Sequence, residues 1–454
     1  MFAELTENLD AAVQAFFRDE ELDRLAREIG FTKRPDGKIS GSVFFDLIVF
    51  NSDKLKEQSL NDLSLEAKKR HEIDITKQSL HERFNEYAPL FLKAALEKLL
   101  QKQVLKHVEF GQLSHFKRVL IKDSICFEVD PSLAAAYPGS GGSASTAAMR
   151  IQYEYDLLSG RINDLSLHAF NDQDHKDSLA TVALTGEGDL IIRDLGYLNL
   201  AVLQKLLDQK VCFLGRLSPT LNVYELKNGD YQEVDFVKIH QYMKRLKLAT
   251  LEKEVYLGSE KKIKVRLVIY LLPDQEVEKR LRKAAKNNKK KARKPLSKEY
   301  KTRAALNLFI TNTTPEQIAT ESIWPFYRLR WQIELIFKIW KSIGKIHEVK
   351  KVKQPRLECY VYAKLIFIVL GWQLIWRVAK VLYHREGKLL SFYKSFKTLL
   401  GKYVDEIKQA LLASKSVMEN FISKFYGLSR SHHLLEKREQ QSTPMEELLA
   451  MLIQ

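Results

Sequence analysis

The segment WPFYRLRWQIELIFKIWK, residues 324–341, carries four polar side chains at helical spacing within an otherwise apolar run. They are Tyr327, Arg330, Glu334 and Lys341. Because an α-helix advances about 100° per residue, the four fall within a sector of roughly 60° on one face. Charges on so apolar a helix are costly unless they are paired, bind an ion or face a charged ligand. The segment therefore predicts a helix whose polar face has a function.

A purely structural explanation of this segment competes with the functional one. Glu334 could form an ordinary helix salt bridge with Arg330 or Lys338, each four residues away. Tyr327 and Trp331 could simply belong to the core. The rest of the chain has to decide between the two.

Size and charge narrow the class of protein. The chain has 454 residues, enough for roughly two to four domains and a large core. Its 73 Lys and Arg against 57 Asp and Glu give a formal net charge of +16. A large protein with this excess is a candidate binder of polyanions. Composition alone does not separate DNA from RNA or from an acidic membrane surface.

Cysteine use and hydropathy predict a soluble protein of the cytoplasm, with no membrane partner. Cys126, Cys212 and Cys359 lie far apart with no CxxC pair, which argues against a disulfide framework or a zinc site. The first residues are acidic and lack the features of a secretion signal. The most apolar run, residues 365–376, is too short to span a bilayer and predicts a buried helix.

Residues 1–110 predict a helical domain. Residues 59–70 and 75–87 can form two helices around a short turn, which is the spacing of a helix-turn-helix motif. In that motif a set of polar side chains would be available to a DNA groove: Thr76, Lys77, Gln78, His81 and Arg83. A helical hairpin inside a bundle explains the same pattern equally well.

Residues 111–350 change to an α/β pattern. Residues 119–123 and 190–194 predict short buried strands that each end in an aspartate, Asp123 and Asp194, and residues 125–129 could continue the first of them. Residues 149–158 and 161–170 predict a hairpin around Ser159 and Gly160. A helix at 199–209 followed by a strand at 211–217 completes a mixed sheet.

The remaining segments are a β-rich insertion and a helical tail. Short strands are expected at 223–226, 251–257 and 264–272, within an insertion that covers about residues 218–303. Residues 279–303 contain 13 Lys or Arg and one acidic residue, Glu299, which predicts either a nucleic-acid contact or a solvated helix or linker. Residues 351–454 predict helices that could serve dimerisation, with a capping box at residues 443–446.

The three acidic residues Asp123, Asp194 and Glu334 form a plausible carboxylate triad. Residues at the ends of buried strands project from the sheet edge where α/β folds place their sites. Three close carboxylates repel one another, and oxygen-only ligands suit Mg²⁺ or Mn²⁺. Two such ions can activate an attacking oxygen and stabilise a leaving one in phosphoryl transfer. A basic protein with this site is expected to cut or join nucleic acid.

The spacing Tyr327-x2-Arg330-x3-Glu334-x6-Lys341 resembles the Tyr-Arg-Glu-Lys signature of a family of bacterial insertion-sequence transposases. These are DDE transposases with an RNase H-like catalytic core. Lys122-Asp123-Ser124 and Asp194-Leu-Gly-Tyr197 are also similar to that family. The resemblance covers roughly residues 115–345, and the long gap between Asp194 and Glu334 matches the family's β-rich insertion.

The resemblance implies a role for each matching residue. Asp123, Asp194 and Glu334 would bind two divalent ions, Mg²⁺ or Mn²⁺. Arg330 and Lys341 would contact DNA phosphates near the cleaved end, Tyr327 would hydrogen-bond a phosphate, and Arg216 would lie near the transferred end.

The expected reaction follows from the same resemblance. A dimer would bind the terminal inverted repeats of its own element in double-stranded DNA and cut at the element boundary. The freed 3′-OH would then attack target DNA. Two alternatives remain open, namely a metal-dependent nuclease of the same fold without strand transfer and a non-catalytic basic DNA-binding protein.

One position departs from the family pattern. Some members carry a tryptophan on the strand before the glutamate helix, which stacks on a base flipped from a DNA hairpin. Leu308 stands there in this sequence, and leucine lacks the π-face needed for stacking. Phe309 or Trp331 could take over that role.

Overall fold

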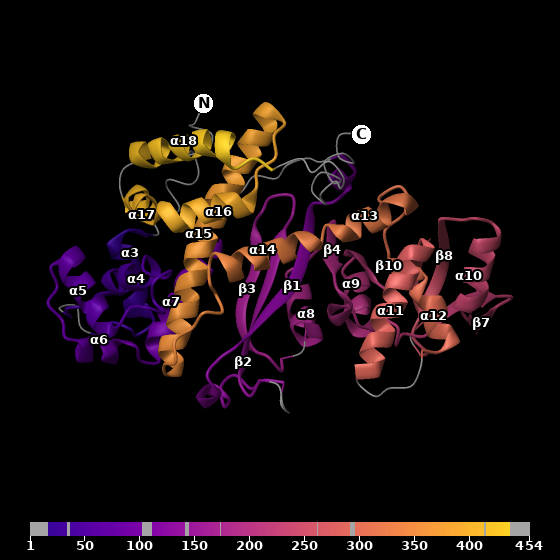
Figure 1. The fold of residues 1–454 in the computed structure, drawn as a ribbon, viewed down its shortest axis with the longest axis horizontal. Coiled ribbons are helices and arrows are strands. Elements are labelled where there is room, and N and C mark those ends of the chain that lie inside the picture. The colour runs from indigo at the N-terminus through magenta and orange to yellow at the C-terminus, as the bar shows by residue number, and fades with distance from the viewer. Residues whose placement is uncertain are drawn as a thin grey trace.

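The computed structural model describes residues 17–33, 37–101, 111–140, 145–172, 174–260, 262–290, 296–412 and 415–435. The fold is mixed α/β. Helices gather at one end and over the middle of the molecule, and one sheet extends from the middle to the other end (Figure 1). The capping box expected at residues 443–446 lies outside the described residues.

The N-terminal region is helical, as predicted. It contains α3 (Asp19–Glu28), α4 (Gly41–Val49), α5 (Leu60–His71), α6 (Lys77–Arg83) and α7 (Tyr87–Gln101). A capping box between Ser59 and Asp62 starts α5, and Glu72 ends it in the left-handed conformation at φ 57°. The second helix expected at 75–87 is shorter than predicted, because the chain turns at Phe84 before α7 begins.

One side chain expected to face a DNA groove is used inside this region instead. The guanidinium of Arg83 donates to the Ile39 carbonyl and lies over the ring of Phe31. Thr76, Lys77 and Gln78 are exposed. The helix pair is therefore present with a smaller polar surface than the sequence suggested.

A single ten-stranded sheet runs in the order β3-β2-β1-β4-β5-β10-β9-β8-β6-β7. Its first half contains β1 (Arg118–Glu128), β2 (Ala148–Asp156), β3 (Ile162–Ala169), β4 (Asp189–Arg193) and β5 (Cys212–Arg216). β1, β4 and β5 are parallel neighbours, whereas β2 pairs antiparallel with β1 and β3 pairs antiparallel with β2. The helices α8 (Asp174–Val182) and α9 (Leu200–Asp208) belong to this half, and α9 begins at Asn199, whose side chain caps it.

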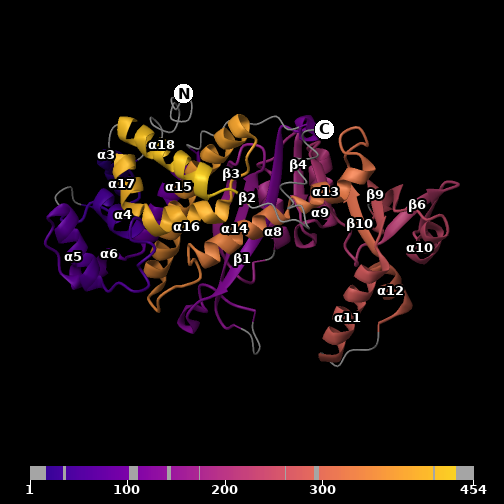
Figure 2. The same cartoon turned by 45° about the horizontal axis from the view of Figure 1, so that its top comes forward.

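The insertion extends this sheet rather than forming a separate one. It contains β6 (Val223–Lys227), β7 (Asp230–Glu233), β8 (Thr250–Leu257) and β9 (Ile263–Leu271), and β10 (Leu306–Thr311) joins it antiparallel to β5. The basic stretch forms two helices, α11 (Asp274–Lys290) and α12 (Lys298–Ala304), and α11 projects from the sheet (Figure 2). The strand β7 and the helix α10 (Phe236–Arg245) were not predicted from the sequence.

The C-terminal region is built around the long helix α15 (Gln354–Glu386). Three further helices follow it, namely α16 (Phe392–Lys402), α17 (Val404–Leu412) and α18 (Lys415–His432). By length and composition α15 could cross a membrane, but 83% of its most apolar window is buried inside the protein. The prediction of a buried helix is confirmed, although the helix is far longer than the apolar run. At the hairpin turn, Gly160 (φ 74°) approaches Trp376 so closely that a Cβ would lie 2.3 Å from the ring.

The central sheet separates two apolar cores. The larger core joins the N-terminal helices, α15 and the helix α14 (Trp331–Ser342) to one face of the sheet, which we name the α14 face. The smaller core lies on the opposite face, here named the α8 face, with α8, α9 and α10 packed against it. Side chains along each strand alternate between the two faces.

Candidate active site

Asp123 and Asp194 come from neighbouring parallel strands. Lys122 of β1 lies opposite Arg193 of β4, so the two aspartates follow at the same level of the sheet. Asp194 comes directly after β4, as predicted. Asp123 does not end its strand, because β1 continues to Glu128 while its pairing with β4 stops at Lys122. Beyond Lys122, β1 is therefore no longer paired with β4, and this side of the strand forms a sheet edge beside the two aspartates.

The segment at 324–341 is not one continuous helix. The helix α13 (Ile323–Arg328) is followed by a tighter turn, in which Arg330 N bonds Tyr327 O and Ile333 N bonds Arg330 O, before α14 continues. These i to i−3 bonds are those of a 3₁₀ turn. Tyr327, Arg330 and Glu334 still reach the same carboxylate cluster, so the predicted shared face survives the break.

Arg330 bridges two of the three carboxylates. Its guanidinium donates to Asp123 Oδ2 at 2.7 Å and to Glu334 Oε1 at 3.1 Å. Tyr327 donates its hydroxyl to Asp194 Oδ1 at 3.1 Å. The structural explanation predicted the ion pair between Arg330 and Glu334, and this pair exists. Arg330 also pairs with Asp123, however, which lies 207 positions away in the sequence. The polar face therefore brings all three acidic residues together.

The apolar side of α14 fixes this arrangement. Trp340 and Phe337 pack on Tyr153 of β2, with ring centroids 4.9 Å and 6.2 Å from the tyrosine ring. Ile333, Ile336 and Ile339 are buried, whereas Leu335, expected in the apolar part, is 53% exposed. The buried aromatic contacts hold the helix on β1 and β2, so Glu334 stays directed toward the aspartates.

The pKa values of Asp123, Tyr327 and Arg330 are all raised within this cluster. Burial raises the pKa of Asp123, and the charges of Asp194 and Glu334 add to this against Arg330 and a backbone hydrogen bond. Burial and the nearby carboxylate of Asp194 raise the pKa of Tyr327, which stays protonated and donates. Burial alone would lower the pKa of Arg330, but Tyr327 and the three carboxylates raise it.

The donor set suits a hard divalent cation. Three carboxylates surround one cationic group, Arg330, whose buried Nε finds no acceptor among the described residues. Within the described part of the chain, no three His, Cys, Asp or Glu side chains lie close enough to hold a metal ion in this conformation. Oxygen ligands of this kind fit Mg²⁺ or Mn²⁺. Arg330 thus lies where positive charge is required.

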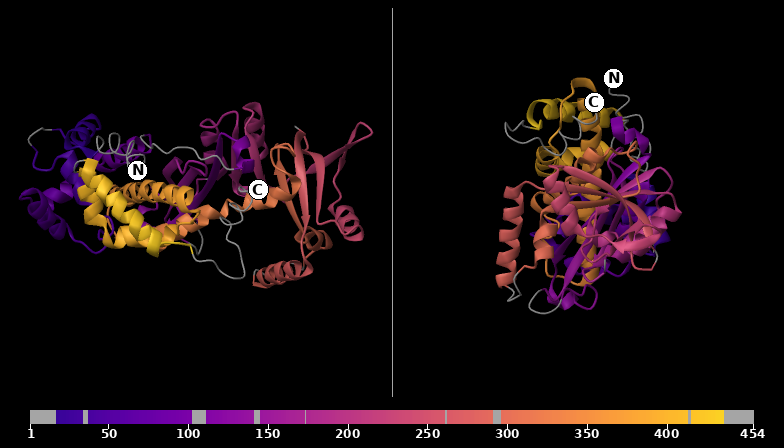
Figure 3. Two further views of the ribbon diagram at one scale, coloured as in Figure 1. Left: turned by 90° about the horizontal axis from the view of Figure 1, so that it is seen from above. Right: turned by 90° about the vertical axis from the view of Figure 1, so that its right-hand side faces the viewer.

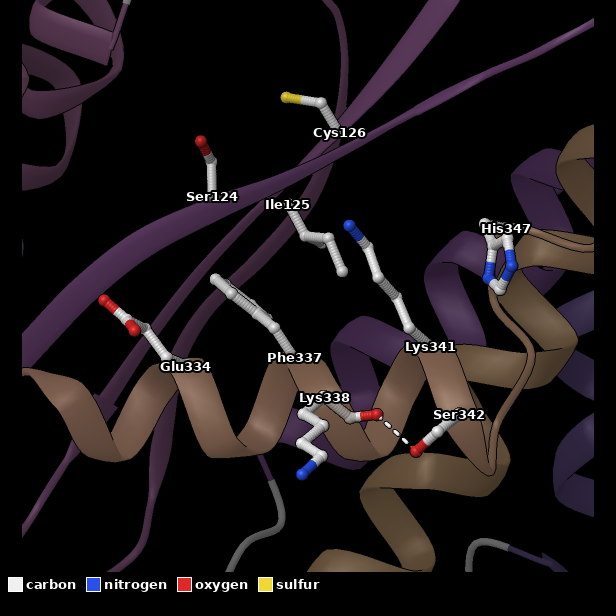
Figure 4. A pocket seen from close by; sticks show the side chains of 9 residues that line it. All are labelled: Ser124, Ile125, Cys126, Glu334, Phe337, Lys338, Lys341, Ser342 and His347. Atoms are coloured by element: carbon white, nitrogen blue, oxygen red, sulfur yellow. Dashed lines mark hydrogen bonds between the residues drawn. The ribbon is translucent and has the colours of Figure 1, made fainter. Parts of the chain in front are cut away.

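A groove leads from Glu334 along α14 (Figure 4). It is lined by Ser124, Ile125, Cys126, Glu334, Phe337, Lys338, Lys341, Ser342 and His347. Lys341 extends into it between the edge of β1 and α14 (Figure 4). The predicted fourth member of the signature therefore lies along the same surface as Glu334.

The other candidate residues fall on either side of the cluster. Arg216 ends β5 opposite Phe309 of β10, and its charge acts on Tyr327. Leu308 is buried in the core on the α8 face, and Phe309 is 1% exposed against Tyr327 and Trp324. Trp331 is 44% exposed at the start of α14, so of the two aromatic substitutes only Trp331 is accessible.

A charged network that was not predicted from the sequence lies on the α8 face, directly behind the aspartates. Lys122 pairs with Asp164 at 2.5 Å and Asp177 at 2.7 Å, and Arg193 pairs with Glu154 at 2.5 Å. Burial alone would raise the pKa of Glu154, but Arg193 and Lys122 hold it below its usual value. The signal was present in the sequence, since a basic residue precedes each aspartate on its buried strand.

Comparison with known proteins identifies the family of the chain. Residues 114–370 match the family model described as "Transposase DDE domain", which defines the class as a DDE transposase. The transposase for insertion sequence element IS231F of Bacillus thuringiensis subsp. israelensis is 33% identical over 444 residues, covering 95% of this chain and 91% of that protein. The IS1151 transposase of Clostridium perfringens is 28% identical over 436 residues, covering 91% of each.

The chain belongs to the family of DDE transposases of bacterial insertion sequences. It is therefore an enzyme that acts on DNA, in a class that depends on divalent metal ions. A solved structure of the piggyBac transposase synaptic complex with hairpin DNA aligns with 12% identity and a TM-score of 0.42, covering 95% of this chain and 86% of that one.

Proposed function

We propose that the protein cuts DNA at the ends of its own insertion sequence and joins the freed ends to target DNA at the Asp123, Asp194 and Glu334 cluster. The observation that carries this proposal is the bridge from Arg330 to Asp123 and Glu334. Charged groups from segments 207 residues apart share one half-buried cluster, which is costly unless they serve a ligand. The strand order 3-2-1-4-5 in the first half of the sheet supports an RNase H-like core.

The three carboxylates would hold two Mg²⁺ or Mn²⁺ ions. When bound, these ions would neutralise the phosphate and favour both the attacking and the leaving oxygen. Arg330 would then be free to leave the carboxylates and contact a DNA phosphate. Tyr327 remains a hydrogen-bond donor because its pKa is raised, and Lys341 offers a further cation along the groove.

The proposal for the rest of the chain follows its layout. Residues 1–110 would read the inverted repeats, residues 111–350 would carry out the reaction, and residues 351–454 would support a dimer on DNA in the cytoplasm.

The basic helices of the insertion would hold the DNA backbone. Neutralising several lysines between residues 286 and 294 should then weaken DNA binding and flatten its dependence on salt; an unchanged salt slope would argue for a solvated segment.

The direct test is Mg²⁺-dependent cleavage of a DNA duplex that carries the inverted repeats flanking the gene. Glu334→Gln should remove cleavage while the variant still folds and binds that duplex. Glu321→Gln is the matched control, because Glu321 is an exposed glutamate just before α13. Normal cleavage by Glu334→Gln would refute the assignment of the active site.

Strand transfer separates a transposase from a nuclease of the same fold. A supercoiled target plasmid should receive precleaved element ends and become a joined product in the presence of Mg²⁺. If cleavage occurs without joined products, the hydrolytic alternative is correct for this chain. Trp331→Ala tests the exposed aromatic in the same assay, where loss of a hairpin intermediate would assign it the base-stacking role.

A further inference from the structure

The sheet face that carries the carboxylates continues onto β5 and β10. Arg216 lies directly opposite Phe309, and residues opposite one another in antiparallel strands point to the same face. Phe309 packs on Tyr327, with ring centroids 5.1 Å apart, so this face is the α14 face. Asn307, two residues before Phe309, points the same way, while Leu308 between them packs in the core on the α8 face.

Arg280 reaches this face from the helix α11. Its guanidinium donates to Asn307 Oδ1 at 2.8 Å and to the Ala304 carbonyl at 3.5 Å. Asn307 is only 3% exposed and fixes the arginine on the sheet. The basic side chains nearby on α11 behave differently. Lys279 and Arg282 are about four-fifths exposed and pair with Glu276 and Glu278 of their own helix.

Among the residues that the structure describes, no carboxylate is hydrogen-bonded to either arginine, so the two form a positive pair. The acceptors of Arg280 are a carbonyl and an amide oxygen, both neutral. Burial lowers the pKa of Arg280, the charge of Arg216 lowers it further, and Glu276 offsets only part of this. Like charges held together in a partly buried place repel, and a bound anion would relieve that repulsion.

We propose that Arg216 and Arg280 together bind one phosphate of the DNA backbone, on the insertion side of the carboxylates. This inference rests on the proposed function and adds Arg280 and its anchor Asn307 to the DNA-binding surface. Figures 1 and 3 show α11 on the same side of the sheet as α14. A DNA strand crossing Asp123 and Asp194 would therefore meet Lys341 on one side of the cluster and the arginine pair on the other.

Arg303 provides a matched control within the same insertion. It is half-buried like Arg280 and also bonds a backbone carbonyl, that of Pro219. Its guanidinium lies over Phe236, which packs against the core on the α8 face. Removal of Arg303 should therefore disturb the insertion to a similar degree without removing the phosphate contact.

The test compares Arg280→Ala and Arg303→Ala in the full chain, binding a DNA duplex that carries the flanking inverted repeat. Arg280→Ala should weaken binding roughly tenfold and lower the salt slope by about one, because one phosphate contact is lost. Arg303→Ala should leave the slope unchanged. The double variant Arg216→Ala/Arg280→Ala should lose less than the sum of the single losses, because both side chains hold the same phosphate.

A second binding measurement replaces one backbone phosphate of the duplex at a time by a neutral methylphosphonate. A purely structural role of Arg280 would not change the resulting profile. One position should weaken binding by the wild type and have no effect on Arg280→Ala. If Arg280→Ala fails to fold, Asn307→Ala should show the same loss of sensitivity in milder form. Equal salt slopes and equal methylphosphonate profiles for wild type and Arg280→Ala would overturn the proposal. Since these are binding measurements, a wild type that binds but never cuts DNA would instead refute the proposed function.

Discussion

The two faces of the sheet at Asp123 and Asp194 hold charges in opposite ways. On the α8 face, Lys122, Arg193 and Glu154 are all 0% exposed, and every charge is paired at 2.5–2.7 Å. On the α14 face, the side chain of Asp123 is 23% exposed and that of Glu334 is 59% exposed, and a single arginine serves both. Both faces use the strands β1 and β4, because Lys122 and Arg193 on the α8 face directly precede Asp123 and Asp194 on the α14 face.

The difference separates two uses of charge. A fully paired buried network aligns β1, β2 and β4, because breaking any pair would leave an uncompensated charge. The open cluster contains more acidic groups than its cation can satisfy, which is unfavourable for stability and favourable for binding cations. We expect substitutions on the α8 face to reduce stability and substitutions on the α14 face to remove activity.

The largest effect is expected for Asp194→Asn in the cleavage assay. Loss of a carboxylate that holds the catalytic ions removes several kcal/mol of transition-state stabilisation, so the rate should fall roughly a thousandfold or more. Thermal unfolding should change little, since the Asp194 side chain does not cap the following turn and, within the described part of the chain, accepts a hydrogen bond from Tyr327. A variant that unfolds while retaining its specific activity would reverse the assignment of the two faces.

The next effect is on the α8 face. Arg193→Met removes the ion-pair partner of the buried Glu154, which keeps a hydrogen bond from Asn163, and should cost about 3–5 kcal/mol of the free energy of unfolding in urea. The double substitution Arg193→Met/Glu154→Met should recover much of that loss. Recovery of stability together with cleavage would show that the network acts through strand alignment alone.

Arg118→Met is the matched control for that pair. Arg118 of β1 joins Asp189 of β4, four residues before Lys122, with an N–O distance of 2.5 Å, whereas Arg193 of β4 joins Glu154 of β2. The Arg118 side chain is 36% exposed and that of Asp189 is 3% exposed, so the loss should be smaller than that of Arg193→Met, in which both partners are 0% exposed. A loss as large as that of Arg193→Met would show that position along the strands, rather than burial, decides the cost.

A smaller effect is expected in the pH dependence of Asp123→Asn. The raised pKa of Asp123 means that the folded wild type binds its proton more tightly than the unfolded chain does. Wild-type stability from this group is present below its ordinary pKa of about 4 and is lost as pH rises through the raised value. Asp123→Asn should therefore match wild type in acid and become the more stable protein near neutral pH. Urea unfolding at a series of pH values measures this, and a variant less stable at neutral pH would contradict it.

The sequence predicted the elements with strong apolar patterns. The strands β1, β2, β4, β5 and β9 and the helix α9 lie within a few residues of their expected positions. The strand β7 was missed because all four of its residues are exposed and carry no alternating pattern. The break between α13 and α14 was missed because the spacing of Tyr327 and Glu334 fits a continuous helix as well as a tight turn.

The site was predictable as far as local spacing and the family resemblance reach. The residues Asp123, Asp194 and Glu334 were identified as a set, and Arg330 was expected to contact a DNA phosphate or, in the structural alternative, to pair with Glu334 of its own helix. Its contact with Asp123 depends on how α14 packs across β1, which no local pattern encodes. For the same reason, the link between Arg280 and Asn307 could not be predicted from a run of basic residues.

The central claim is that the open cluster on the α14 face holds divalent ions for reaction on DNA. Electron paramagnetic resonance of Mn²⁺ titrated into the full chain, bound to its inverted-repeat duplex, measures this directly. Bound Mn²⁺ should appear with wild type and with Arg118→Met, and should be lost in Asp123→Asn and Glu334→Gln. If both of these variants bound Mn²⁺ as tightly as wild type does, the ions would lie elsewhere and the account would be wrong.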